Sequence, residues 1–488
     1  MLTRILKYSC YLLLGGMVMT GCKKLEDINH DPTKPTTTEP QYLLTGAEKS
    51  AMDILYAGPQ NGRTAMAYAQ YWTGNDKAND ARYLLDEGIN APIWNNLYSV
   101  SLHNLNEIIR LNKEKPLPVS GNQIAIAQIL KAWIYQVLAD TYGNIPYSDA
   151  LKDVNNLRPK YDDAKGIYNA LIDTLTQQAA AIDLSQSSYP TGDVIFKGDV
   201  SLWKKLAHSL LLRLAIRMVD ADPAKAKSVI EANWQGAMAS NADGAVFTYL
   251  TAAPNKFPYN ESERELSEFF VTSTLVDYMA GVDDPRLQVY ARPTKLDTVY
   301  RGLPYGTSES NPSRLPPSGY SYPGTRIYAA DMAGILMTYP EVEFILAEAA
   351  ARGIAVGGDA ATHYQNGVKA SLEYWDITDA NVVNTYMQKV PYNEADWRNV
   401  IGTQKWLALY PQGLQGWFER LRLNFRKPGG DSLFIAPVDG SLDQNVKFVP
   451  YRLTYPVSEQ QQNSASYQAA ATAIGGDTKG VKLWWNKQ

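Results

Sequence analysis

Apolar residues recur with helical periodicity along most of the chain. In the segment 199–219, one face carries a leucine or methionine every fourth residue, at Leu202, Leu206, Leu210, Leu214 and Met218. The same kind of spacing predicts helices over 41–56, 61–72, 91–112, 121–142, 164–183, 199–219, 223–232, 266–280, 338–352, 359–375 and 395–409. No comparable alternation with period two is present, so the sequence predicts that any strands are short.

The segment 338–353 contains its own helix boundaries. Thr338 and Glu341 predict a capping box, Pro340 lies in the first turn, and Gly353 is suited to the left-handed conformation that ends a helix. The run that follows places small and aromatic residues on one face, at Ala360, Tyr364, Gly367 and Ser371. This pattern is typical of the second helix of a tetratricopeptide hairpin. We therefore expect an all-α fold of stacked tetratricopeptide-like helical hairpins.

Proline and glycine concentrate in long segments between the periodic ones, at 251–262, 291–330 and 428–456. Irregular loops on a helical scaffold are frequent places for binding. The sequence therefore predicts one domain over 41–488, with hairpins mainly in 41–250 and 331–410. The irregular capping parts are expected at 251–330 and 411–488.

The N-terminus has the pattern of an export signal. Arg4 and Lys7 precede an apolar run, 11–19, that is too short to span a bilayer. The run ends in Met19-Thr20-Gly21-Cys22, which resembles a bacterial lipobox and predicts a signal peptide over 1–21 with lipidation of Cys22. The alternative is an ordinary secretory signal followed by a chance cysteine. Residues 22–40, rich in proline and threonine, are expected to form a flexible tether.

Composition narrows the possible functions. Hydrophobic residues make up 45% and charged residues 20% of the chain, which is typical of a globular protein. A net charge of −4 without a basic run argues against nucleic acid as a partner. Tyrosine (32) and tryptophan (11) together far outnumber phenylalanine (10), and these two residue types are enriched where a surface binds a ligand.

Signatures of catalysis are missing from the sequence. The histidines show no metal-ligand spacing, at His30, His103, His208 and His363, and no phosphate-binding loop is present. The segment 306–310 lacks the second glycine of a G-x-S-x-G motif. We therefore expect no enzyme, no metal and no cofactor. An all-helical glycoside hydrolase remains an alternative, because it needs only two carboxylates at a set separation.

Two stretches are candidates for ligand binding. The first combines aromatic rings with amide, carboxylate and guanidinium groups, at Tyr71, Trp72, Asn75, Asp76, Asn79, Arg82 and Tyr83. Rings can stack on the C–H faces of a sugar while the polar groups bond to its hydroxyls. The second stretch lies in the loop 291–330, at Tyr305, Tyr320, Tyr322, Arg326 and Tyr328. Trp72 is the predicted principal platform, and the alternative is that its ring packs inside a hairpin.

Other aromatic and charged residues are expected to maintain the fold. They lie at helix ends or within the apolar pattern, at 140–147, Trp406, Trp484 and Trp485. Arg213 and Arg217 are expected to reach a helix end or a carboxylate.

An ordered set of motifs resembles the SusD/RagB family of nutrient-binding lipoproteins, most closely its SusD-like subgroup. Besides the lipobox, these are Asn29-His30-Asp31-Pro32, the segment 139–147, Pro159-Lys160-Tyr161-Asp162, the helix 203–217, Asp283-Asp284-Pro285-Arg286, the helix 339–349, Gln404-Lys405-Trp406, Pro450-Tyr451-Arg452 and Leu483-Trp484-Trp485-Asn486. The resemblance covers essentially the whole chain.

The resemblance implies an outer-membrane protein that is lipid-anchored on the cell surface. It would be the lid of a SusC-like TonB-dependent transporter, would bind oligosaccharide or, in the alternative, peptide, and would not be an enzyme. In relatives, an aromatic residue of an early loop lines the glycan site, which favours the stretch around Trp72.

Overall fold

The predicted helical faces are buried between neighbouring helices in the computed structural model, which describes residues 38–84, 86–152, 155–261 and 268–488. Residues Pro40–Gln488 form one unit by their internal contacts. The predicted signal peptide 1–21, Cys22 and the tether as far as residue 37 lie outside the described residues.

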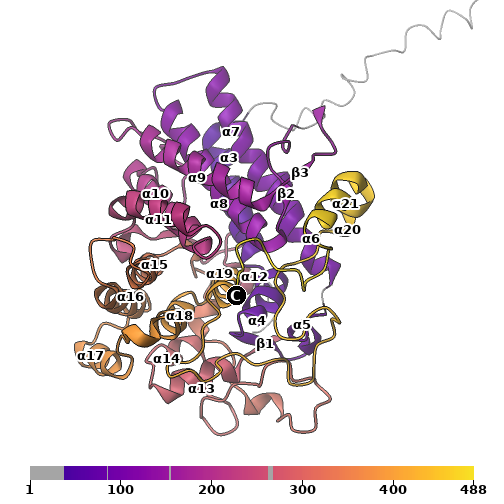
Figure 1. The fold of residues 1–488 in the computed structure, drawn as a ribbon, viewed down its shortest axis with the longest axis vertical. Helices are drawn as coiled ribbons and strands as arrows, with labels where there is room; N and C mark the ends of the chain where they lie inside the picture. Colours follow the sequence, from indigo (N-terminus) through magenta and orange to yellow (C-terminus); the bar gives the residue numbers. More distant parts are fainter. Residues whose placement is uncertain (1–37, 85, 153–154, 262–267) are drawn as a thin grey trace, which may run out of the picture. The chain divides into compact units, whose positions relative to one another are not determined.

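The first half of the described chain is largely helical (Figure 1). Its elements are α3 (Pro40–Leu55), the π-helix η1 (Gly58–Ala65), α4 (Met66–Tyr68), β1 (Trp72–Gly74), α5 (Ala78–Ala81), α6 (Glu87–Asn96), the π-helix η2 (Leu97–Leu102), α7 (His103–Glu114), α8 (Ser120–Tyr142), β2 (Ile145–Pro146), β3 (Tyr161–Asp162), α9 (Ala164–Ala181), α10 (Val200–Arg217), α11 (Pro223–Asn233) and β4 (Ala245–Phe247).

The second half begins with short elements and returns to longer helices. These are α12 (Pro258–Glu261), β5 (Phe269–Val271), α13 (Ser273–Gly281), α14 (Leu287–Tyr290), the 3-10 helix η8 (Thr325–Tyr328), β6 (Gly334–Met337), α15 (Tyr339–Ala351), α16 (Ala360–Tyr374), α17 (Ala380–Lys389), α18 (Trp397–Ala408), α19 (Gly413–Leu423), α20 (Val457–Gln462) and α21 (Ser464–Ala473).

Most helices pack against the helix that precedes or follows them in sequence, and some also pack against a more distant one. Helix α8 contacts α7 and α9, α10 contacts α9 and α11, and α15 contacts α16 and α18. Aspartates define several of the helix starts, since the carboxylates of Asp163, Asp199 and Asp359 accept hydrogen bonds from first-turn N–H groups of α9, α10 and α16. The chain therefore has the all-α, tetratricopeptide-like fold that its periodicity predicts.

The start of α15 corrects the predicted capping box. Thr338 is the residue before the helix and Pro340 lies in the first turn, as expected, but the Thr338 side chain makes no capping hydrogen bond. Glu341 is buried and binds Arg213, with Nη2–Oε2 at 2.6 Å. A carboxylate forms a stronger hydrogen bond with a guanidinium than with a neutral backbone N–H. Glu341 therefore binds Arg213 and does not cap the helix. Gly353 has φ +77° and follows the helix end as predicted.

The predicted helices 61–72 and 266–280 are only partly correct. Gln70 adopts φ +56°, and this conformation precedes a strand. Its side chain donates from Nε2 to Ile435 O and accepts at Oε1 from Thr274 Oγ1. Strand β1 then pairs antiparallel with β5, with Trp72 opposite Val271. The other paired strands are β2 with β3 and β4 with β6, each antiparallel and two to four residues long.

A buried ion network connects α10, α15, α18 and α19. Arg422 binds Glu348 and Glu419, both at 2.6 Å, and Lys405 lies 3.0 Å from Glu419. Arg217 lies 3.3 Å from Glu419 and, on the other side, 3.7 Å from Asp140 of α8. The expectation that Arg213 and Arg217 reach carboxylates is confirmed.

The residues expected to maintain the fold are packed where that role requires. Asp140 Oδ1 accepts hydrogen bonds from Tyr168 Oη (2.5 Å) and from Trp485 Nε1 (2.9 Å). Trp406 is fully buried, and its Nε1 donates to Ala69 O at 2.9 Å. Trp484 is half-buried against Tyr168.

Candidate functional site

The two predicted binding stretches lie against each other. The carbonyl and side-chain oxygens of Asn75 both accept hydrogen bonds from Arg314 Nη2, which is 3.1 Å from Asn75 Oδ1. The Ala78 N–H donates to Glu309 Oε1 at 3.2 Å. Segments more than 200 residues apart in sequence therefore share one surface.

A third segment completes this surface. Arg82 donates from Nε to Gly440 O (2.9 Å) and from Nη2 to Asp439 O (2.7 Å). The Asp439 carboxylate accepts hydrogen bonds from Ser308 N and Oγ and from Asn311 Nδ2, each at 2.7 Å. We define the loop face as residues 75–84, 291–322 and 435–448.

Asp439 holds the loops of this face together. The hydrogen bonds from the backbone and hydroxyl of Ser308 favour its ionised form and lower the pKa of Asp439 below its usual range. Its carboxylate is already occupied by these donors, so Asp439 positions the loops.

Trp72 does not have the predicted exposed position. Its ring is 0% exposed and stacks between Phe269, at a centroid distance of 5.3 Å, and Tyr328, at 6.0 Å. The indole N–H donates to Tyr410 Oη at 2.8 Å. Because strand β1 faces the core on both sides, the alternative considered above holds and Trp72 packs inside the fold.

Five predicted tyrosines are also buried, at Tyr71, Tyr83, Tyr305, Tyr320 and Tyr328. Three of them satisfy their hydroxyls within the protein: Tyr71 donates to Trp406 O and Tyr83 to Phe448 O, both at 2.5 Å, and the Tyr320 hydroxyl accepts from Leu315 N at 2.9 Å. The expectation that these five rings are available to a ligand is therefore wrong for this structure. The periodicity could not distinguish them, because a tyrosine is stable in a core once its hydroxyl has a partner.

The other predicted residues are accessible. Asp76 and Asn79 are exposed, and Asn75, Arg82 and Tyr322 are half-buried, all on the loop face. Arg326 is exposed but lies 2.6 Å from Asp376 and over the ring of Trp375, which is at the end of α16. The structure thus brings five of the predicted residues together and directs Arg326 elsewhere.

Tyr322 is the accessible aromatic ring of the predicted set. Its centroid lies 4.8 Å from that of Phe270, and the guanidinium of Arg292 lies over its ring at 5.3 Å. Arg314, which binds Asn75, lies 6.0 Å from the Phe270 centroid. A half-buried ring beside a guanidinium group suits stacking on a C–H face with hydrogen bonds to neighbouring hydroxyls.

The sequence analysis did not single out the exposed apolar residues of the loop face. Seven large apolar side chains of this face are exposed, at Leu84, Leu296, Val299, Leu315, Val438, Leu442 and Phe448. The Leu442 N–H donates to Arg82 O at 2.7 Å and the Tyr83 hydroxyl donates to Phe448 O, which brings the third segment close to Arg82 and Tyr83. The available signal was the proline- and glycine-rich composition of 428–456, which indicated a loop but not which of its residues were exposed.

A comparison with protein-family models gives a match over residues 32–456, to a SusD-like family described as "Starch-binding associating with outer membrane". The chain belongs to the SusD-like family. A comparison with curated proteins found no match.

Solved structures of SusD-like proteins share the fold. A chitin-binding protein has a TM-score of 0.83 at 25% identity, over 92% of this chain and all of its own. A chitin-binding SusD homologue from Flavobacterium johnsoniae has a TM-score of 0.79 at 22% identity, covering 91% of this chain and 98% of its own. A SusD-like protein from Bacteroides thetaiotaomicron has a TM-score of 0.76 at 24% identity, covering 92% and 99%.

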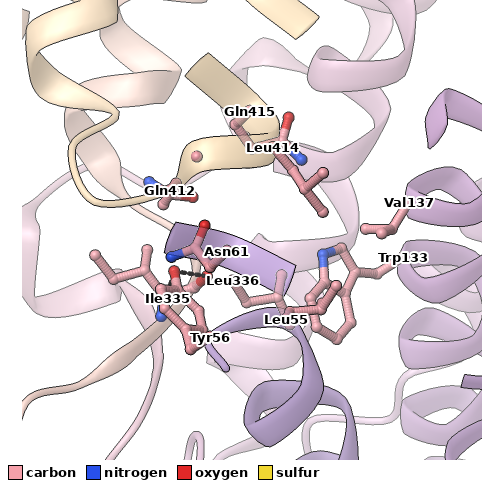
Figure 2. Close-up of a pocket in the computed structure, with 11 residues that line it drawn as sticks. Leu55, Tyr56, Asn61, Trp133, Val137, Ile335, Leu336, Gln412, Leu414 and Gln415 are labelled. Atoms are coloured by element: carbon pink, nitrogen blue, oxygen red, sulfur yellow. Dashed lines mark hydrogen bonds between the residues drawn. The ribbon is translucent and has the colours of Figure 1, made fainter. Parts of the chain in front are cut away.

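An internal cavity of this SusD-like chain is too small for a sugar. Figure 2 shows the residues that line it. Trp133 lies on one side of the cavity, and the polar residues lie on the other, at Tyr56, Asn61, Gln412 and Gln415. Its volume of about 30 Å³ has room for water only. Tyr56 is held beside it by the backbone of Ile335, to whose carbonyl oxygen it donates at 2.9 Å.

The described ranges contain neither a cluster of potential metal ligands nor a membrane-spanning helix. No group of three or more potential metal ligands is present there. His208 lies 2.8 Å from Asn233 Oδ1 and His363 lies 2.8 Å from Glu343 Oε2, so both pack as structural residues. Among the same residues, no helix is both long enough and apolar enough to cross a membrane.

Proposed function

We propose that this SusD-like protein captures oligosaccharide on its loop face and does not cleave it. Anchored at the cell surface of the outer membrane through a lipid on Cys22, it acts as the lid of a SusC-like TonB-dependent transporter and delivers the ligand to it. The lipobox supports the lipid anchor, and membership of the SusD-like family supports the transporter as partner. The residues of the loop face support oligosaccharide as the ligand class.

The observation that carries the proposal is that Tyr322 packs on Phe270, close to which lies Arg314, the partner of Asn75. The exposed polar residues Asp76 and Asn79 follow Asn75 in the chain. A sugar stacks on an aromatic ring and bonds through its hydroxyls to planar side chains. Two structurally similar proteins are chitin-binding, which makes chitin oligosaccharides the first ligands to test, followed by starch.

The test is native affinity electrophoresis and calorimetry with these glycans. Tyr322→Ala is expected to weaken binding by about tenfold, corresponding to the loss of one ring contact of about 1.4 kcal/mol. The matched control is Tyr42→Ala, because Tyr42 is 65% exposed on α3, away from the loop face. Equal weakening by both variants, or none by Tyr322→Ala, would contradict the placement of the site.

Peptide is the alternative ligand of the same face. A peptide mixture that competes with glycan, or binds when no glycan does, would favour it.

Prolonged incubation with a bound oligosaccharide separates binding from hydrolysis. We expect no shortened product, and a product that disappears when one carboxylate is neutralised would indicate a glycoside hydrolase.

The anchor and partner are tested in cells. Cys22→Ala is expected to abolish incorporation of labelled lipid and to release the protein from the membrane. The native protein should co-purify with a TonB-dependent barrel. Membrane attachment that persists without lipid, or purification without any barrel, would contradict these parts of the proposal.

A further inference from the structure

A second, separate pocket lies on the N-terminal helices. It has a volume of about 320 Å³ and is lined by Asn106, Gln128, Lys131, Ala132, Tyr135, Tyr147, Ser148, Ala150, Leu151, Leu171 and Thr174. These residues come from α7, α8, α9 and the loop after β2. Figure 1 shows α7 and α9 toward the upper end of the view and β1, α5 and α13, which adjoin the loop face, toward the lower end.

Lys131 is the charged side chain of this pocket. Among its described lining residues no other is charged, and within the described chain no ion pair joins Lys131 to a carboxylate. An ammonium group has three N–H donors, and the structure pairs one of them with Asn106 Oδ1 at 3.0 Å. The remaining donors are free to bind an anion in the pocket.

The surroundings of Lys131 disfavour its charge. Burial and the nearby Lys113 lower the pKa of Lys131 to about 8. A half-buried ammonium without a counter-ion gains more from an incoming anion than one that is already paired.

The neutral part of the lining suits a hydroxylated molecule. Gln128 makes no side-chain hydrogen bond to any described residue, and Thr174 and Asn106 add a hydroxyl and an amide. Tyr135 and Tyr147 meet edge to face at 4.8 Å and form an aromatic wall. The volume is at the lower end of the roughly 300–1,000 Å³ of small-molecule sites, which suits one small molecule and excludes a long glycan chain.

We propose that this pocket, the Lys131 pocket, is a second ligand site that takes a small hydroxylated carboxylate, of which a uronic acid is the simplest example. A single cation in a neutral lining matches a monoanion. A doubly charged phosphate would leave one charge unpaired. The site does not rest on the loop face, and either can fail without the other.

The test is calorimetric titration of the purified protein with galacturonate and, as the neutral counterpart, galactose at pH 7. Galacturonate is expected to bind and galactose to bind at least about tenfold more weakly, as for loss of one charge-assisted hydrogen bond. Lys131→Gln should weaken galacturonate binding by a similar factor. Lys165→Gln, the same charge change on neighbouring α9, and Tyr322→Ala on the loop face should leave it unchanged.

Proton uptake provides a readout that a merely structural lysine would not affect. At pH 8.5 part of Lys131 is deprotonated, and a bound carboxylate raises its pKa, so binding takes up protons and its heat depends on the buffer. Affinity should fall as pH rises above about 8. The other titratable groups near the site are Lys113 on α7, Tyr135, Tyr147, Asp162 and Asp173. The two carboxylates also raise the pKa of Tyr147. Burial raises the pKa of both tyrosines, so they stay neutral over this range.

Several results would overturn the proposal. These are no galacturonate binding at millimolar concentration, equal affinity for galactose, binding without proton uptake, or undiminished binding by a folded Lys131→Gln variant. If that variant does not fold, an experiment on the native protein still tests the proposal. Acetylation of Lys131 at pH 8, followed by mass spectrometry, should slow when galacturonate is present, and an unchanged rate would refute the site.

Discussion

Several buried tyrosine and tryptophan residues of this protein donate their polar hydrogen to a backbone carbonyl. The Trp417 indole N–H donates to Pro450 O and the Tyr290 hydroxyl to Leu407 O, both at 2.8 Å. Burying a ring without such a partner would leave an unsatisfied donor at a cost of about 1–3 kcal/mol. A high tyrosine content therefore serves packing in this core.

Trp72→Ala is expected to lower the free energy of unfolding by about 3–5 kcal/mol, because it leaves a cavity between Phe269 and Tyr328. Urea unfolding measures this change. Tyr42→Ala, at an exposed ring, should change stability by less than about 0.5 kcal/mol. A stable Trp72→Ala variant with weakened glycan binding would restore the original interpretation of Trp72 as a binding platform.

Glu48→Gln is expected to stabilise the protein at pH 7 by about 1–2 kcal/mol. Burial and the nearby Asp193 raise the pKa of Glu48 well above its usual value, so folding disfavours its charged form. A group with a raised folded pKa loses its stabilising contribution as pH rises above the unfolded value of about 4.3. The gain should therefore be measurable by thermal melts at pH 7 and should shrink toward pH 4. An equal gain at both pH values would contradict the electrostatic cause.

The hairpin of α15 and α16 depends on a close approach between its two helices. At Gly367, an added Cβ would lie 3.0 Å from the ring of Phe344 on α15. Glycine is unfavourable inside a helix by itself, so its presence here reflects the space that the neighbouring helix needs.

Gly367→Leu is expected to destabilise the protein by at least about 1–3 kcal/mol through overpacking. The matched control is Gly121→Leu in α8, where an added Cβ has no atom within 4 Å among the described residues. That variant should be neutral or slightly stabilising because leucine favours helix. Thermal melts of the two variants should therefore shift differently, and equal shifts would contradict the close-packing argument.

On the scale of the whole molecule, the buried ion network joins hairpins that are distant in sequence. Burial would raise the pKa of Glu419, but Arg422, Lys405 and Arg217 outweigh it and hold that pKa well below its usual range. Burial would likewise raise the pKa of Glu348, but Arg422 and Arg352 outweigh it and lower that pKa below its usual value. Both glutamates thus stabilise the folded state in their ionised form.

Glu419→Gln is expected to cost about 3–5 kcal/mol at pH 7, because it leaves buried cations without their partner. A lowered folded pKa contributes stability above the unfolded value of about 4.3 and loses it as pH falls toward the folded value. The difference between native protein and variant, measured by urea unfolding, should therefore narrow below about pH 4. Glu107→Gln, in an exposed pair with Arg110, should change stability by less than about 1 kcal/mol.

The sequence by itself determined the helical class, the principal hairpins and the two stretches that meet on the loop face. These follow from local periodicity and from the breaks that proline and glycine impose, which nearby residues encode. The buried roles of Asp140, Trp406 and Trp485 were also predictable, because they lie at helix ends or within apolar patterns.

Only the tertiary structure decided which aromatic rings are accessible. Trp72 lies in a strand whose partner strand, Phe269–Val271, is remote in sequence. Glu341 binds Arg213 and does not have its predicted capping role. The Lys131 pocket likewise forms where three helices and a loop meet. Burial and charge pairing depend on contacts between distant segments, and these contacts leave no periodic signal in the chain.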